Sequence, residues 1–77
     1  MTETLYDNIV KIVTYYLGPA AQRFVDRQIT FHLQKSPQEV TVEDLKGLTE
    51  WMRVSLALLT DDRTTVDECA RKLIQLI

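Results

Sequence analysis

Apolar positions recur with helical spacing along most of the chain, and they cover the widest arc in residues 43–60. At ~100° per residue this segment carries one apolar stripe made of Leu45, Leu48, Met52, Leu56 and Leu59, and a second stripe beside it made of Trp51, Val54 and Leu58. The two stripes together span roughly 200° of the helix, whereas an ordinary surface helix shows roughly 100°. We therefore expect a central helix, or a helix whose second stripe is covered by another molecule.

Two helices are predicted before this segment, and a tight corner joins them. The first covers residues 3–17 with Thr2 as its N-cap, because apolar residues repeat on one side and polar residues on the other. Gly18 tolerates the left-handed conformation that ends a helix, and Pro19 suits the first turn of the next one. The second predicted helix covers residues 19–34.

Residues 35–40 form the longest predicted loop, because a proline pushes the residue before it out of the helical conformation. Thr41 then fits a capping box that opens the third helix, and another capping box at residues 65–68 predicts a last helix that runs to the C-terminus. No alternation of the β type extends over more than a few residues. The sequence predicts an all-α fold, a compact bundle of about four helices with short connections in a single domain, residues 1–77.

Gly47 lies inside the third predicted helix. Glycine in a helix interior costs ~1 kcal/mol relative to alanine. We therefore expect a packing reason for this residue, such as the close approach of another helix.

Composition sets limits on size, charge and chemistry. A chain of 77 residues buries only ~60% of its unfolded surface, so a partner chain would add useful burial. One cysteine allows no internal disulfide, and with one histidine the usual zinc spacings are absent, so we expect no metal and no cofactor. A formal net charge of −2 without a cationic run argues against nucleic acid as a partner.

Membrane insertion is not expected either. No apolar run approaches the ~18 residues of a membrane span, and the acidic start of the chain is unlike a secretory signal. We therefore expect a cytoplasmic protein.

Gln28 and His32 lie one turn apart on the apolar face of the second predicted helix. A histidine in this position can change charge between about pH 5 and 8 or bind a ligand, which would make a small polar pocket. Alternatively His32 is a core or interface residue that is hydrogen-bonded to a carbonyl or to Gln28. The sequence favours this second interpretation, because no second base, nucleophile or metal ligand lies near His32 in the chain.

Arg23 and Arg27, one turn apart on the outer side of the same helix, can together contact an anion such as a carboxylate or phosphate. Asp26 beside them favours a solvated charged face instead. Cys69 has acidic neighbours and no base to ionise it, so we expect it in the core. Solvated helix-end charges are the better interpretation of four acidic residues that lack the EF-hand spacing, Asp61, Asp62, Asp67 and Glu68.

The corner Tyr16-Leu17-Gly18-Pro19-Ala20-Ala21, followed by an apolar helix and a leucine-spaced helix, gives the chain a likeness to a known module. Residues 12–59 resemble a small helical module that recurs in prokaryotic signalling proteins, often appended to kinases or response regulators. The module has no agreed catalytic residues, so only Gly18 and Pro19 are carried over from it. The resemblance implies protein contact within bacterial or archaeal signalling rather than chemistry.

These observations favour a small protein-interaction or dimerisation module over an enzyme, because acid, base and nucleophile candidates do not converge on one face. The partner is expected to be another protein or a second copy of the chain. Its predicted contact residues are Trp51, Val54, Leu58, Met52 and Phe31. Two alternatives stay open, a ligand- or pH-responsive sensor with a pocket around Gln28 and His32, and a small inhibitor of a partner enzyme.

Overall fold

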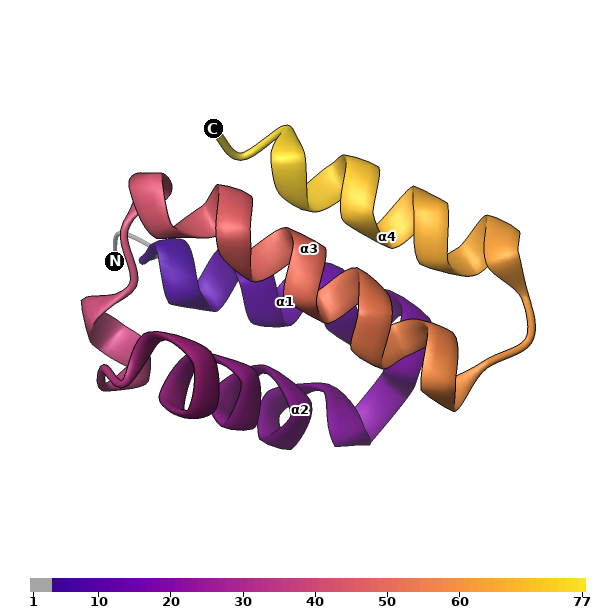
Figure 1. Cartoon of the computed structure of the whole chain (residues 1–77), viewed down its shortest axis with the longest axis horizontal. Helices are drawn as coiled ribbons and strands as arrows, with labels where there is room; N and C mark the ends of the chain where they lie inside the picture. Colours follow the sequence, from indigo (N-terminus) through magenta and orange to yellow (C-terminus); the bar gives the residue numbers. More distant parts are fainter. Residues whose placement is uncertain (1–3) are drawn as a thin grey trace.

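The fold was analysed in a computed structural model that describes residues 4–77. The α-helices of this part of the chain are α1 (Leu5–Leu17), α2 (Ala21–Gln28), α3 (Val42–Leu59) and α4 (Arg63–Ile74). Shorter turns connect them, the 3₁₀ turns η1 (Gly18–Ala20) and η3 (Pro37–Glu39) and the π turn η2 (Ile29–Leu33) (Figure 1). The described residues contain no strand, so the prediction of an all-α protein is confirmed.

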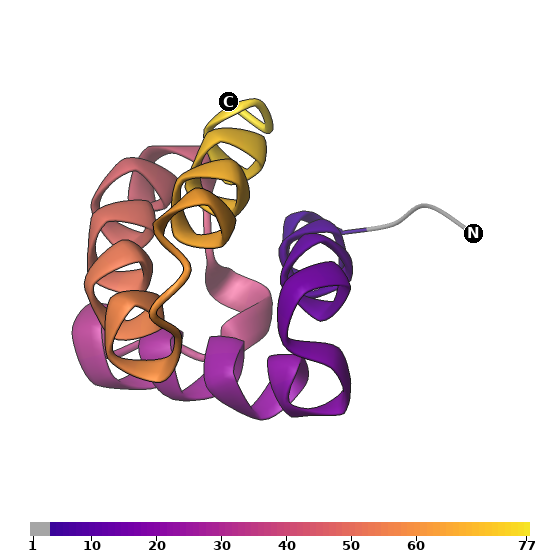
Figure 2. The same ribbon diagram turned by 90° about the vertical axis from the view of Figure 1, so that its right-hand side faces the viewer.

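The helices surround one core. Figure 2 views α1, α3 and α4 nearly end-on, with α2 and η2 running across beneath them. α4 packs against both α3 and α1, whereas α1 packs on α2, and η2 reaches α3. The Cα radius of gyration is 11.3 Å, close to the value of about 11.5 Å expected for a compact domain of this length. The fully buried large side chains at the centre are Ile9, Ile29, Leu45, Leu48, Met52, Leu56 and Leu73.

α1 begins where a threonine caps it. The Thr4 hydroxyl accepts a hydrogen bond from the Asp7 backbone N–H, and the Asp7 carboxylate accepts one from the Thr4 backbone N–H. This reciprocal capping box satisfies two donors at the helix start. The predicted cap Thr2 lies outside the described residues.

The corner after α1 forms as predicted. Gly18 has φ +67° and ψ −144°, a backbone conformation that side-chain-bearing residues rarely adopt, and its N–H donates to the Thr14 carbonyl. Pro19 follows at the start of η1. Glycine is therefore required here by backbone geometry.

The predicted second helix is correct in extent and wrong in regularity. The chain is helical from Gly18 to Leu33, but only α2 is a regular α-helix, with η1 before it and the π turn η2 after it. Gln34 then ends the segment in the left-handed conformation, at φ 55° and ψ 39°. Because of the π turn, the side chains after Gln28 leave the positions that a regular helix would give them.

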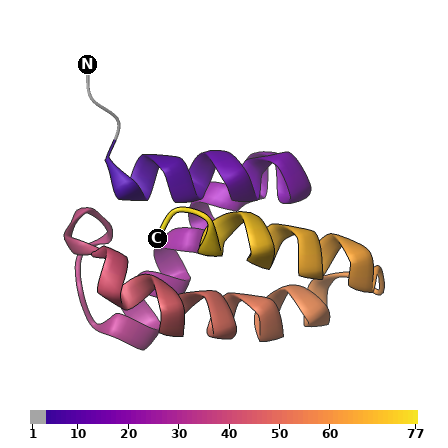
Figure 3. The same ribbon diagram turned by 90° about the horizontal axis from the view of Figure 1, so that it is seen from above.

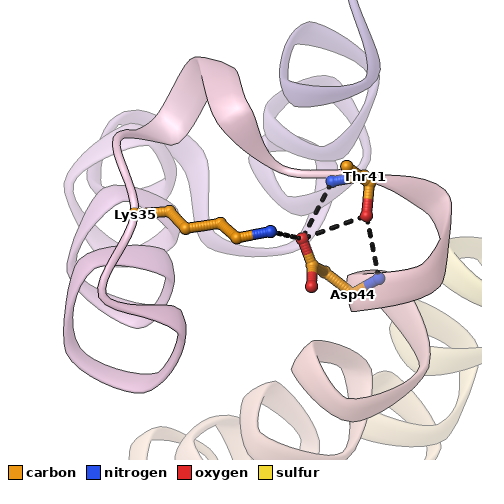
Figure 4. A network of polar contacts seen from close by, with 3 residues as sticks. All are labelled: Lys35, Thr41 and Asp44. Carbon is orange, nitrogen blue, oxygen red and sulfur yellow. Dashed lines mark hydrogen bonds and ion pairs between the residues drawn. The ribbon is translucent and has the colours of Figure 1, made fainter.

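The capping box predicted for α3 is present, and a side chain from the preceding loop strengthens it. The Thr41 hydroxyl accepts from the Asp44 backbone N–H, and Asp44 Oδ2 accepts from the Thr41 backbone N–H. Lys35 Nζ lies 2.7 Å from the same Oδ2 (Figure 4). The hydrogen bond from Lys35 and those from Thr41 hold the pKa of Asp44 below its usual value.

Two other expectations about α3 and α4 are wrong. α4 begins at Arg63 rather than after Thr65, because the Asp62 carboxylate accepts hydrogen bonds from the backbone N–H groups of Thr64 and Thr65 and caps the helix earlier. Gly47 is exposed, and a Cβ placed on it would meet nothing within 4 Å. No helix of the described chain approaches it.

Candidate functional site

Three apolar side chains of α3 stay uncovered on the outer edge of the molecule. Trp51, Val54 and Leu58 are 52%, 57% and 84% exposed, and we call them the α3 stripe. Figures 2 and 3 show the side of α3 that faces away from α1 without another helix over it. Of the two alternatives for the wide apolar arc, the described residues therefore show a helix whose second stripe is not covered by the rest of the chain.

Two residues of α3 were placed on the wrong surface by the sequence. Met52, included among the predicted contact residues, is fully buried and belongs to the core. Leu59, which shares the first apolar stripe with Met52, is exposed in the last turn of α3, directly before the cap residue Thr60. Met52 is therefore excluded from the candidate surface, and Leu59 is included at its edge.

The π turn extends the stripe with an aromatic contact. The His32 ring stacks on the Trp51 indole, with centroids 4.4 Å apart and planes 8° apart. The Phe31 ring contacts the His32 ring edge-on, with 5.2 Å between the ring centroids. Phe31 is itself largely exposed. Phe31, His32 and Trp51 thus form a continuous row of rings that leads onto Val54 and Leu58.

Gln28 and His32 do not form the polar pair that the sequence proposed. Among the described residues, no hydrogen bond joins them, and the side-chain oxygen of buried Gln28 has no partner. His32 packs on Trp51 instead. The three best-formed hollows on residues 4–77 are lined by other side chains.

A groove runs along one side of the α3 stripe, where the end of α3 meets the start of α4. Its volume is about 560 Å³. Val54, Ala57 and Leu58 line it from α3, and Val66 lines it from α4. Two oppositely charged residues, Arg53 and Asp67, stand at its rim with 3.7 Å between their nearest charged atoms. The groove therefore has an apolar wall and a charged rim.

Arg23 and Arg27 lie in a different, open hollow on the outside of α2, together with Phe31. Both arginines are exposed, and neither forms an ion pair among the described residues. Asp26 shares the hollow, and its carboxylate accepts a hydrogen bond from the Tyr6 hydroxyl. The two arginines thus share one hollow with a carboxylate that would repel an anion.

Cys69 is fully buried, as expected for a core residue. Burial raises the pKa of its thiol to about 11, so almost no nucleophilic thiolate exists at neutral pH. Within residues 4–77, His, Cys, Asp and Glu side chains form no group of three that could hold a metal ion. Across the same residues, every helix is too short or too polar to cross a bilayer.

Two features of this face, the stacking of His32 on Trp51 and the groove beside Ala57, were not predicted from the sequence. The stacking joins two segments that are 19 residues apart, and the groove depends on the angle at which α4 leaves α3, so the periodicity of one helix encodes neither feature. The surplus width of the apolar arc was the one signal that pointed to this face.

Comparison with protein families, curated proteins and solved structures found no match to this chain. The resemblance of residues 12–59 to a prokaryotic signalling module therefore stays a prediction, and the function has to be inferred from the surface itself.

Proposed function

We propose that this chain is a protein-interaction module that binds another protein surface through the α3 stripe. The observation that carries the proposal is the uncovered apolar row on α3, continued by Phe31 of the π turn. Soluble proteins rarely leave contiguous apolar patches of this kind open unless another molecule covers them.

The size of the patch supports this function. At roughly 200 Å² for a fully exposed large side chain, the observed exposures add up to on the order of 600 Å². The largest patch on a typical monomer is about 300–600 Å², and each partner in a standard interface buries about 800 Å². The residues counted are Phe31, Trp51, Val54, Leu58 and Leu59.

Trp51 is the expected anchor of the contact. Tryptophan is enriched at the energetic centres of interfaces. Here the stacked His32 ring already holds the indole in place, so binding would cost less side-chain entropy than it would for a free side chain. The exposed half of the indole is then presented in a defined orientation.

Site-specific photo-crosslinking in the cells that naturally make the protein tests this function. A crosslinking amino acid at position 51 should give a protein adduct of defined mass, and the added substitution Leu58→Glu should abolish it. The matched control places the same amino acid at position 15, since Tyr15 is equally aromatic and 79% exposed but lies on α1. Adducts that are absent from position 51, equal at both positions, or unaffected by Leu58→Glu would refute the function.

A further inference from the structure

We infer that the molecule covering the α3 stripe is a second copy of this chain, with the two α3 helices antiparallel across a two-fold axis near Val54. This inference depends on the function proposed above and names its partner. In a two-fold interface, the same surface of each copy must complement itself. The α3 stripe meets this condition in both shape and charge.

The shape of the stripe is self-complementary in the antiparallel arrangement. With the axis at Val54, residues before Val54 on one copy face residues after it on the other. At ~100° per residue, Trp51 and Leu58 lie on the same side of Val54, so Trp51 faces Leu58 of the other copy and Val54 faces Val54. Each exposed indole is thus covered by an exposed leucine of the opposite stripe.

The N-terminal half of α3 carries the exposed glycine on the same side. Gly47, Trp51, Val54 and Leu58 are spaced by four, three and four residues, the spacing of a coiled-coil seam. The open space around Gly47 leaves room for the connection between α3 and α4 of the other copy. A second helix can thus follow the whole seam without meeting a bulky side chain at its end.

Charges at the two ends of the seam favour the antiparallel direction. The first turns of α3 carry exposed Glu43 and Lys46, and Asp61 in the connection after α3 and Arg63 at the start of α4 are exposed as well. An antiparallel pair brings these two regions together, so that Lys46 meets Asp61 and Glu43 meets Arg63. A parallel pair would instead place each charged residue beside the identical residue of the other copy, and like charges in contact destabilise an interface.

The area points to a reversible dimer. Two patches of on the order of 600 Å² bury about 1,200 Å² in total, at the lower end of standard interfaces. Interfaces at this end of the range are typical of weak, transient contacts, so we expect a dimer that dissociates at low micromolar concentration.

Sedimentation equilibrium of the full chain between about 1 and 500 μM tests the assembly. The mass should rise from 8.9 kDa toward twice that value. Trp51 is the sole tryptophan, so its fluorescence emission should shift to shorter wavelength over the same range as the indole is buried against the other copy. Leu58→Glu should weaken the dimer at least tenfold, while the control Tyr15→Ala on α1 should leave it unchanged.

A charge-reversal pair tests the antiparallel direction. Lys46→Glu alone and Asp61→Lys alone should each weaken self-association, because each creates like charges at both ends of the two-fold contact. Mixing these two variants should restore a dimer of wild-type affinity, because both ends of the mixed pair then carry opposite charges. Circular dichroism at 222 nm checks that every variant is folded.

Three outcomes separate the two proposals. A chain that stays monomeric at 500 μM, or charge variants that fail to rescue each other, would overturn the antiparallel dimer. If the crosslink from position 51 still gave a Leu58-dependent adduct of another mass, the interaction function would stand with a different partner. Loss of both signals would overturn both proposals.

Discussion

Gly18 and Gly47 provide a test of the fold in which the same substitution should have opposite effects. A Cβ added at either position would meet nothing within 4 Å, so crowding plays no part at either site. The two residues differ in backbone conformation, since Gly18 has φ +67° and Gly47 lies inside regular α3. Replacement by alanine therefore isolates the effect of backbone conformation.

Gly47→Ala should stabilise the protein. Alanine is favoured over glycine in a helix interior by about 0.8–1.0 kcal/mol. Because Gly47 is exposed, this whole difference should be seen in the free energy of unfolding. For a chain of this length, this change should raise Tm by about 4–8 °C. Gly18→Ala should instead destabilise it by about 1–3 kcal/mol, because a side chain is strained in that region of conformational space. Both changes reduce the entropy of the unfolded chain alike, so this contribution cancels in the comparison.

Urea unfolding followed by circular dichroism at 222 nm measures both effects. With an m-value of about 1–2 kcal/mol/M, Gly47→Ala should move the midpoint up by about 0.5–1 M and Gly18→Ala should move it down by at least as much. The measurement belongs at about 2 μM, below the expected dimer dissociation constant. Changes of the same sign at both positions would refute the reasoning. Destabilisation by Gly47→Ala at this dilution would show that a segment of the same chain approaches the helix there.

Three further predictions concern the charge network, the buried thiol and the two sides of α3. Because the pKa of Asp44 is lowered in the folded state, its ionised form stabilises the protein at pH above about 4 and loses this contribution as the pH falls below that value. Asp44→Asn should therefore lower the urea midpoint at pH 7 and reduce the decrease of this midpoint between pH 4 and 2. An unchanged decrease at acid pH would contradict the network with Lys35. Cys69, with its pKa of about 11, should carry on the order of 100-fold less thiolate at pH 7 than an ordinary cysteine. It should therefore react with a disulfide reagent only after urea unfolds the chain. Met52→Ala should lower the free energy of unfolding, measured in urea, by about 2–5 kcal/mol. Leu58→Ala should change it by less than about 0.5 kcal/mol in the monomer. Equal effects would mean that the buried and exposed sides of α3 are misassigned.

Local signals in the sequence were sufficient for the elements that depend on neighbouring residues. The helical period predicted an all-α fold, the threonine at position 41 predicted the start of α3, and Gly18 predicted the corner after α1. Each of these features arises from hydrogen bonds or backbone preferences within a few residues of the chain. The width of the apolar arc on α3 also indicated that the chain has more apolar helix surface than an ordinary surface helix buries.

Only the tertiary structure decided which of these apolar residues are buried. Met52 and Leu59 belong to one stripe by their spacing, yet the core covers the first and leaves the second exposed in the last turn of α3. The π turn after α2 likewise turned His32 away from Gln28 and onto Trp51. Periodicity fixes the direction in which a side chain leaves its own helix, whereas burial depends on where the neighbouring helices cross and end.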